Sequence, residues 1–186
     1  MLDLSVVDTW GSSAAERVDA YPCDALVERP DRVLFRAVDV DAPTAHVFRW
    51  LCQLRVAPYS YDWIDNRGRR SPRRLIDGLD QLEIGQTFAT IFRLRAFEPG
   101  RSLTLESTTP AFGHVALTYR VSATTRDRSR LVAKVRLTSP RGPYGLVARH
   151  LLPAGDLVMM RRQLLNLKAL AERDAHEEAQ TVPRDG

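Results

Sequence analysis

The sequence is poor in lysine, cysteine and long apolar runs, and each shortage excludes a class of protein. Its two cysteines, Cys23 and Cys52, form neither a CxxC pair nor a metal-binding spacing, which predicts buried, reduced thiols instead of a disulfide framework or a zinc site. No stretch approaches the roughly 18 uninterrupted apolar residues of a membrane-spanning helix. The N-terminus lacks a basic segment followed by an apolar one, so no secretion signal is indicated. We therefore expect a soluble, cytoplasmic protein.

Motifs that would hold a metal, a phosphate or a nucleophile are also missing. No two of the four histidines have the spacing of metal ligands. The segment Gly142-Pro143-Tyr144-Gly145 lacks both the lysine and the spacing of a phosphate-binding loop. No serine occupies a nucleophile-elbow pattern. The sequence therefore predicts neither a metal site nor a cofactor.

The basic residues are nearly all arginine, because lysine occurs only at Lys134 and Lys168. The net charge of +4 would suit nucleic acid or an anionic membrane, but acidic residues are interspersed along almost the whole chain. One cluster surrounds Ser71-Pro72 and consists of Arg67, Arg69, Arg70, Arg73 and Arg74. It indicates a solvated basic loop, or recognition of an acidic ligand or a membrane surface. We expect no nucleic-acid partner.

The length of 186 residues and the hydrophobic content of 44% are those of one domain with a sizeable core. Residues 1–32 are irregular but contain Trp10 and Tyr21, so we expect an extension that packs on the domain. Residues 33–175 carry the regular hydrophobic patterns and form the domain itself. Residues 176–186 are charged and polar, which predicts a flexible tail.

Hydrophobic periodicity predicts a strand, a helix, several strands and a final helix. Residues 33–40 alternate, and Asp41-Ala42-Pro43 then opens a helix that ends near Ala57-Pro58. A loop is expected at 124–129, and the final helix begins at Pro153 or is kinked there. Four further strands are expected in an antiparallel meander, at 87–98, 102–107, 112–123 and 130–138.

Alternation in the last two strands separates an apolar face from a polar one. Val115, Leu117 and Tyr119 share one face, as do Leu131, Ala133 and Val135 in the next strand. The opposite face, which carries Arg120, Lys134 and Arg136, is expected to be exposed to solvent. An apolar sheet face has to be buried against helices. The sequence thus predicts an α+β fold in which a curved antiparallel β-sheet wraps around a long C-terminal α-helix, with room for a cavity between them.

Several segments resemble one known group of proteins. They are the run Arg36-Ala37-Val38-Asp39-Val40-Asp41-Ala42-Pro43, the element Tyr59-Ser60-Tyr61-Asp62-Trp63 and the hairpin Phe97-Glu98-Pro99-Gly100-Arg101. Together they resemble the SRPBCC, or START-like, superfamily, and within it a bacterial branch that is similar to polyketide cyclase/dehydrase and lipid-transport proteins. The resemblance implies the helix-grip fold and a cavity for a hydrophobic ligand. It does not imply a reaction, because this superfamily contains carriers, receptors and aromatase/cyclases.

The candidate site residues follow from the aromatic element and the predicted inner face. Tyr59, Tyr61 and Trp63 would stack on an apolar ligand while Asp62 fixes a polar group or acts as a general base. The alternative is that these aromatic residues pack the helix onto the sheet and that Asp62 caps a turn. Tyr119 would line either the cavity or the core, and its buried hydroxyl needs a partner.

Two further kinds of side chain remain candidates. Met160, on the final helix, suits a cavity of adaptable shape or an ordinary core. Arg93 and Arg95 share a strand face, and if that face were the inner one, Arg95 could clamp a carboxylate or enolate. Otherwise both arginines point outward, and a bulge in this strand would exchange the two arrangements.

These observations favour a protein that binds a small hydrophobic ligand, such as a lipid, a polyketide or an aromatic metabolite, in an internal cavity. A polyketide cyclase/dehydratase-type enzyme is the first alternative, with Asp62 as the base and Tyr119 or Arg95 stabilising an enolate. A module that binds an anionic membrane or a partner through the arginine cluster is the second. The sequence does not decide between carrier and catalyst.

Overall fold

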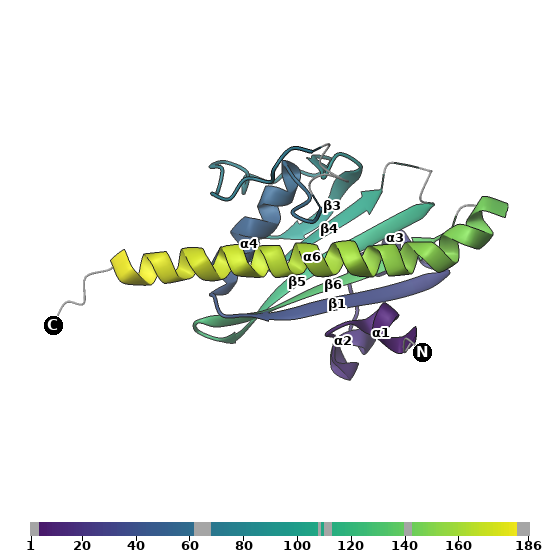
Figure 1. Cartoon of the computed structure of the whole chain (residues 1–186), viewed down its shortest axis with the longest axis horizontal. Coiled ribbons are helices and arrows are strands. Elements are labelled where there is room, and N and C mark those ends of the chain that lie inside the picture. Colours follow the sequence, from purple (N-terminus) through teal and green to yellow (C-terminus); the bar gives the residue numbers. More distant parts are fainter. Residues whose placement is uncertain (1–3, 62–67, 108, 110–112, 140–142, 182–186) are drawn as a thin grey trace.

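A six-stranded antiparallel sheet, with one long helix across its inner face, forms the centre of the fold (Figure 1). The computed structural model describes residues 4–61, 68–107, 109, 113–139 and 143–181, without the side chains of residues 4–6 and 143–154. In sheet order the strands are β1 (Arg32–Val40), β6 (Arg128–Thr138), β5 (His114–Thr125), β4 (Ser102–Ser107), β3 (Phe92–Glu98) and β2 (Thr87–Phe88). The predicted meander is therefore present, and β1 is added beside its last strand.

The long helix α6 (Pro143–Thr181) has 39 residues and includes Pro153, so the proline lies inside the helix and not at its start. Residues 176–181 continue this helix, where His46 contacts Glu178 and the Thr181 hydroxyl donates to the carbonyl of Glu178 at 2.9 Å. The flexibility of the segment 176–186 stays a prediction. Helix α4 (Thr44–Cys52) follows β1 and packs on α6, and the turn η1 (Gln53–Arg55) continues from its end. Among the described helices, none combines the length and the apolar content needed to cross a membrane.

The inner face of the sheet is apolar because alternate residues of each strand point toward α6. One cross-strand row consists entirely of leucine and valine, none more than 4% exposed: Leu34, Val135, Leu117, Leu105 and Leu94. Leu164 and Leu167 of α6 and Trp50 of α4 complete this core. Burial of one such aliphatic side chain contributes about 1.5–3 kcal/mol, so this layer holds sheet and helices together.

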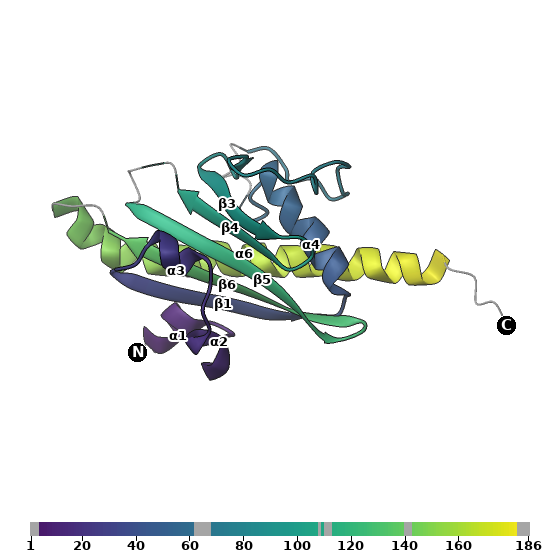
Figure 2. The same cartoon turned by 180° about the vertical axis from the view of Figure 1, so that it is seen from behind.

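Alternation alone predicts that the outer face of the sheet is exposed to solvent. The N-terminal segment instead covers part of this face. The short helix α3 (Cys23–Leu26) lies on the side of the sheet opposite α6 (Figure 2). Lys134 is 5% exposed, and its ammonium lies 2.7 Å from an Asp24 oxygen and 4.9 Å from the centre of the Tyr21 ring. Burial opposes ionisation of Asp24, but hydrogen bonds from Lys134 and from the Tyr21 amide outweigh it, and the pKa of Asp24 is lowered. The two other N-terminal helices are α1 (Leu4–Thr9) and α2 (Ala14–Val18).

The segment predicted as one strand at 87–98 is interrupted and bulged. Ala89 and Thr90 have φ angles of 42° and 69°, which separate β2 from β3. The register shifts between Leu94 and Ala96, so the alternation of faces slips by one residue. The predicted loop at 124–129 is also shorter than expected, because β5 extends to Thr125 and β6 starts at Arg128.

Both cysteines are free and buried, which confirms the predicted reduced thiols. Burial raises the pKa of Cys52 to about 12, so its thiol stays protonated and unreactive at neutral pH. Cys23 is the first residue of α3 on the outer face, and its backbone N–H donates to the hydroxyl of Thr118 at 3.1 Å. The thiols therefore belong to the packing of two opposite faces and not to a common site.

Candidate ligand-binding site

One cross-strand row of the inner face carries polar side chains. It runs across five strands through Arg36, Ala133, Tyr119, Leu103 and Phe97. Arg36 is 0% and Tyr119 is 3% exposed, so both polar groups lie beneath α6. Ala133 stands between them, and its small side chain leaves space for the two long neighbours. This row adjoins the all-apolar row of the core and is therefore a polar insertion into an otherwise apolar interior.

Helix α6 places matching groups opposite this row. Asp156, Met160 and Gln163 follow one another at intervals of four and three residues, which brings them to the same side of the helix. The Arg36 Nη2 donates to Asp156 Oδ2 at 2.8 Å, and the Tyr119 hydroxyl donates to Gln163 Oε1 at 2.5 Å. The Tyr119 hydroxyl also lies 3.7 Å from the Met160 sulfur. We refer to Arg36, Tyr119, Asp156 and Gln163 as the polar band.

The protonation of the polar band is set by burial. Burial raises the pKa of Asp156 to about 6, although the Arg36 guanidinium acts in the opposite direction. Burial likewise lowers the pKa of Arg36, but it remains a cation at any ordinary pH. Burial and the nearby Asp156 charge raise the pKa of Tyr119, so its hydroxyl stays neutral and acts as a hydrogen-bond donor. The band thus offers one cation, one neutral donor and a carboxyl that can hold a proton near pH 6.

The interior beside the polar band keeps some contact with solvent. The Asp156 side chain is 22% exposed. Met160 and Val115 pack against the main core but are only half-buried. Val115 pairs with Leu137 on the inner face, two residues before Leu117 along β5. An apolar wall that ends at a few polar groups is the usual composition of a small-molecule site.

Gln163 and its neighbour Asn166 also hold the segment that follows η1. The Gln163 Nε2 donates to the Pro58 carbonyl at 2.6 Å, and the Asn166 Nδ2 donates to the Tyr59 carbonyl at 2.8 Å. Tyr59 has a φ of 55°, in the left-handed region that costs a non-glycine residue roughly 1–2 kcal/mol. Its ring packs edge-on against Trp50, with the ring centres 5.8 Å apart. These contacts fix the chain where α4 meets α6.

The structure brings together only part of the predicted site. Tyr119 contacts Met160 on the side of α6 that faces the sheet. Tyr59 is 2% exposed and packs on Trp50, and Tyr61 is half-buried. Asp62 and Trp63 lie outside the described residues. The role of the aromatic element in ligand binding stays a prediction.

The interpretation of Arg95 as an inward clamp is wrong. The bulge places Leu94 and Phe97 on the inner core and leaves Arg95 on the outer side, where half of its side chain is exposed and it pairs with Glu106. Arg93 is exposed as well, and its guanidinium donates to the Gly85 carbonyl at 3.2 Å. Strict alternation would place Phe97 on the same face as Arg93 and Arg95, and the extra residue of the bulge moves it to the opposite face.

The arginine that does face the interior was missed. Arg36 alternates with Leu34 and Val38 and so shares their inward face, which is a signal that the sequence contains. Asp156 and Gln163 lie at helical spacing from Met160 and could have been found in the same way. A charge within an apolar stripe marks either a buried pair or a site.

A second concave region lies between α6 and the segments 59–60 and 70–73. It has a volume of about 490 Å³. Four arginines line it, two from the predicted cluster and two from α6: Arg70, Arg73, Arg162 and Arg173. Of the described residues that line it, none is acidic. We refer to it as the arginine pocket.

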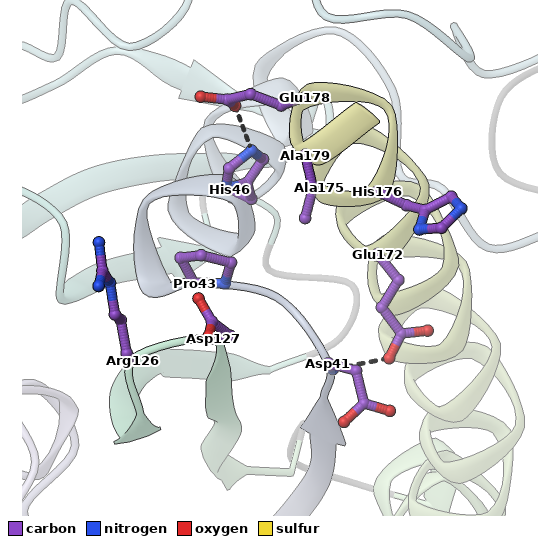
Figure 3. Close-up of a pocket in the computed structure, with 10 residues that line it drawn as sticks. All are labelled: Asp41, Pro43, His46, Arg126, Asp127, Glu172, Ala175, His176, Glu178 and Ala179. Carbon is purple, nitrogen blue, oxygen red and sulfur yellow. Dashed lines mark hydrogen bonds and ion pairs between the residues drawn. The ribbon is translucent and has the colours of Figure 1, made fainter. Parts of the chain in front are cut away.

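A further pocket lies where the start of α4, the β5–β6 turn and the C-terminal part of α6 meet (Figure 3). Its volume is about 700 Å³, and several of the ionisable groups that line it are already paired. His46 Nε2 lies 2.8 Å from a Glu178 oxygen, while Glu172 accepts from the Asp41 backbone N–H at 2.7 Å. His176 points away from His46 (Figure 3). Within the part of the chain that the structure describes, no three His, Cys, Asp or Glu side chains are grouped to hold a metal ion.

Comparison with known proteins supports the fold and goes no further. No family model and no curated protein matches the sequence. A protein from Thermobifida fusca is similar at TM-score 0.50 and 18% identity, over 78% of this chain and 95% of its own. The hypothetical protein jhp0584 from Helicobacter pylori is similar at TM-score 0.50 and 14% identity, over 82% and 95%. The Zhui aromatase/cyclase from Streptomyces sp. R1128 reaches TM-score 0.49 at 16% identity, over 81% and 96%.

The class of protein is therefore defined by its fold. A curved antiparallel sheet that grips a long C-terminal helix is the helix-grip fold, which confirms the fold implied by the resemblance to START-like proteins. Sequence identities of 18% and 14% support a shared fold only, because proteins with one fold perform many unrelated functions.

Proposed function

We propose that this protein binds a small, largely apolar molecule between the sheet and α6, with one polar group of the molecule directed at the polar band. The observation that carries the proposal is the placement of Arg36 and Tyr119 in one buried row, opposite Asp156 and Gln163. A charged pair in the interior contributes little to stability compared with apolar residues of similar size. A role in recognition accounts for its presence.

The half-buried residues beside the band support the position of the ligand. Val115 and Met160 offer apolar surface that the protein itself covers incompletely. Tyr119 presents a neutral hydroxyl and Arg36 a cation at the end of that surface, and each would exchange its present partner, Gln163 or Asp156, for the ligand. The ligand class that matches is an apolar body with one hydroxyl, carbonyl or carboxylate group, because each can accept a hydrogen bond from these donors.

Filling the interior should weaken binding. The Val115→Trp variant places a large ring on the inner face, and we expect it to weaken uptake of the neutral fluorescent probe N-phenyl-1-naphthylamine by about tenfold or more, equal to at least ~1.4 kcal/mol. The matched control is Val33→Trp, since Val33 is a half-buried strand valine on the outer face. The control should bind the probe as the wild type does.

The measurement is a fluorescence titration with the probe for the three proteins, with circular dichroism to confirm that each is folded. Equal binding by Val115→Trp and the wild type would exclude the interior as the site. Failure of the folded wild type to bind any apolar probe would contradict the proposal itself. A neutral probe is essential because an anionic one would also be attracted to the exposed arginines.

A further inference from the structure

We propose that the arginine pocket is a second ligand site, independent of the interior, and that it binds a phosphate group. The residues come from distant parts of the chain: Arg70 and Arg73 from the segment after the aromatic element, and Arg162 and Arg173 from α6. A cluster that is continuous in sequence indicates no more than a basic loop. Convergence of that loop with arginines about a hundred positions later is a property of the fold.

Most of the arginines in this pocket have no acidic partner within the part of the chain that the structure describes. Arg173 pairs with Asp174 at 2.5 Å, but Arg70, Arg73 and Arg162 have no acidic partner among the described residues. Three positive charges around one concavity repel one another and attract anions. The pocket also contains a neutral hydrogen-bond donor for an anion, because the side-chain amide of Asn166 lines it.

The number and type of donors favour phosphate over a single carboxylate. A guanidinium presents several N–H groups in a planar fork that matches the oxygens of phosphate. A carboxylate would neutralise one of the three charges, whereas a phosphate monoester or pyrophosphate carries about two or more charges and additional acceptor oxygens. A volume of about 490 Å³ exceeds the needs of a lone phosphate group, so the ligand class is a phosphorylated small molecule or a lipid phosphate.

The pocket is well formed where it meets the core. Its floor includes Tyr59 and Leu170, which are 2% and 9% exposed and belong to the main core. The Asn166 side chain that lines the pocket is fixed by its hydrogen bond to the Tyr59 carbonyl at 2.8 Å. The α6 side of the site is thus rigid, while Arg70, Arg73 and Arg162 are exposed and adjustable.

The test compares two variants with the same change in net charge. The double variant Arg70→Gln with Arg162→Gln removes one arginine from each wall of the pocket, and the control Arg29→Gln with Arg126→Gln removes two exposed arginines elsewhere. Binding of inorganic pyrophosphate is measured by calorimetry at low salt. We expect the pocket variant to lose about 100-fold in affinity, since each charged hydrogen bond contributes about tenfold or more. The control should change it less than about threefold.

A second arm distinguishes the source of the phosphate. Flotation is measured with vesicles of phosphatidylcholine, with and without phosphatidic acid. Binding of pyrophosphate that is lost only in the pocket variant supports a soluble phosphorylated ligand. Binding only to vesicles that contain phosphatidic acid, again lost only in the pocket variant, supports a lipid headgroup at the same site. No binding of either probe at low salt, or equal losses in pocket and control variants, would overturn the proposal. Because the interior probe is neutral, none of these outcomes depends on the ligand of the interior.

Discussion

Replacing Arg36 by methionine should lower the free energy of unfolding by about 3 kcal/mol at neutral pH, because it leaves the carboxylate of Asp156 without its partner beneath α6. Replacing both residues, as Arg36→Met with Asp156→Met, should restore most of that loss. A buried ion pair exchanged for apolar side chains of similar volume is often neutral or stabilising. Urea denaturation at pH 7 measures both values.

The same strand provides the matched control. Arg32 pairs with Asp8 at 2.7 Å, but the two side chains are 27% and 31% exposed. Because solvent screens such a pair, Arg32→Met should cost about 1 kcal/mol or less. If Arg36→Met costs no more than Arg32→Met, the interior location of Arg36 is contradicted. If the double variant is as unstable as the single one, the loss comes from packing and not from the unpaired charge.

The stability of the wild type relative to Asp156→Asn should fall as the pH rises from about 4 to 6. Burial raises the pKa of Asp156 to about 6, whereas the ordinary value is 3.8. Between these values the folded protein holds a proton that the unfolded chain has released, so a rising pH favours unfolding. The favourable contribution is complete below the ordinary pKa and is lost once the pH has passed the folded value. The asparagine variant has no group that titrates at this position.

The size of this effect follows from the displacement of the pKa. A rise of roughly two units corresponds to about 3 kcal/mol, and this is an upper value because 22% of the Asp156 side chain is exposed. Urea denaturation of both proteins across this pH range gives the difference directly, and other carboxylates cancel because both proteins contain them. A wild type that gains stability over the variant as the pH rises would show that the ion pair with Arg36 outweighs burial.

The elements of the fold could be predicted because they depend on local periodicity. The strand at 33–40, the helix opened by Asp41-Ala42-Pro43 and the meander are all present close to their expected bounds. The face of each strand was predictable only where alternation is unbroken, as in β5 and β6. In β3 a single bulged residue reversed the side on which Phe97 lies, and no feature of the sequence marks that bulge.

The site depended on contacts that local patterns do not encode. The pairing of Arg36 with Asp156 joins residues 120 positions apart, and the arginine pocket joins two segments with a similar separation. The outer face was misjudged for the same reason: Lys134 has the alternation of an exposed residue, and only the packing of α3 with Asp24 shows that it is buried. Sequence periodicity gives the direction of a side chain, whereas its partner is set by the tertiary fold.

Native mass spectrometry of gently purified protein shows whether the interior beside the polar band holds an apolar ligand. We expect a discrete added mass for the wild type and for Val33→Trp, absent from Val115→Trp, and recovery of the bound apolar molecule after denaturing extraction. An unliganded mass for the wild type, unchanged when the protein is incubated with excess apolar probe, would contradict a ligand site in the interior.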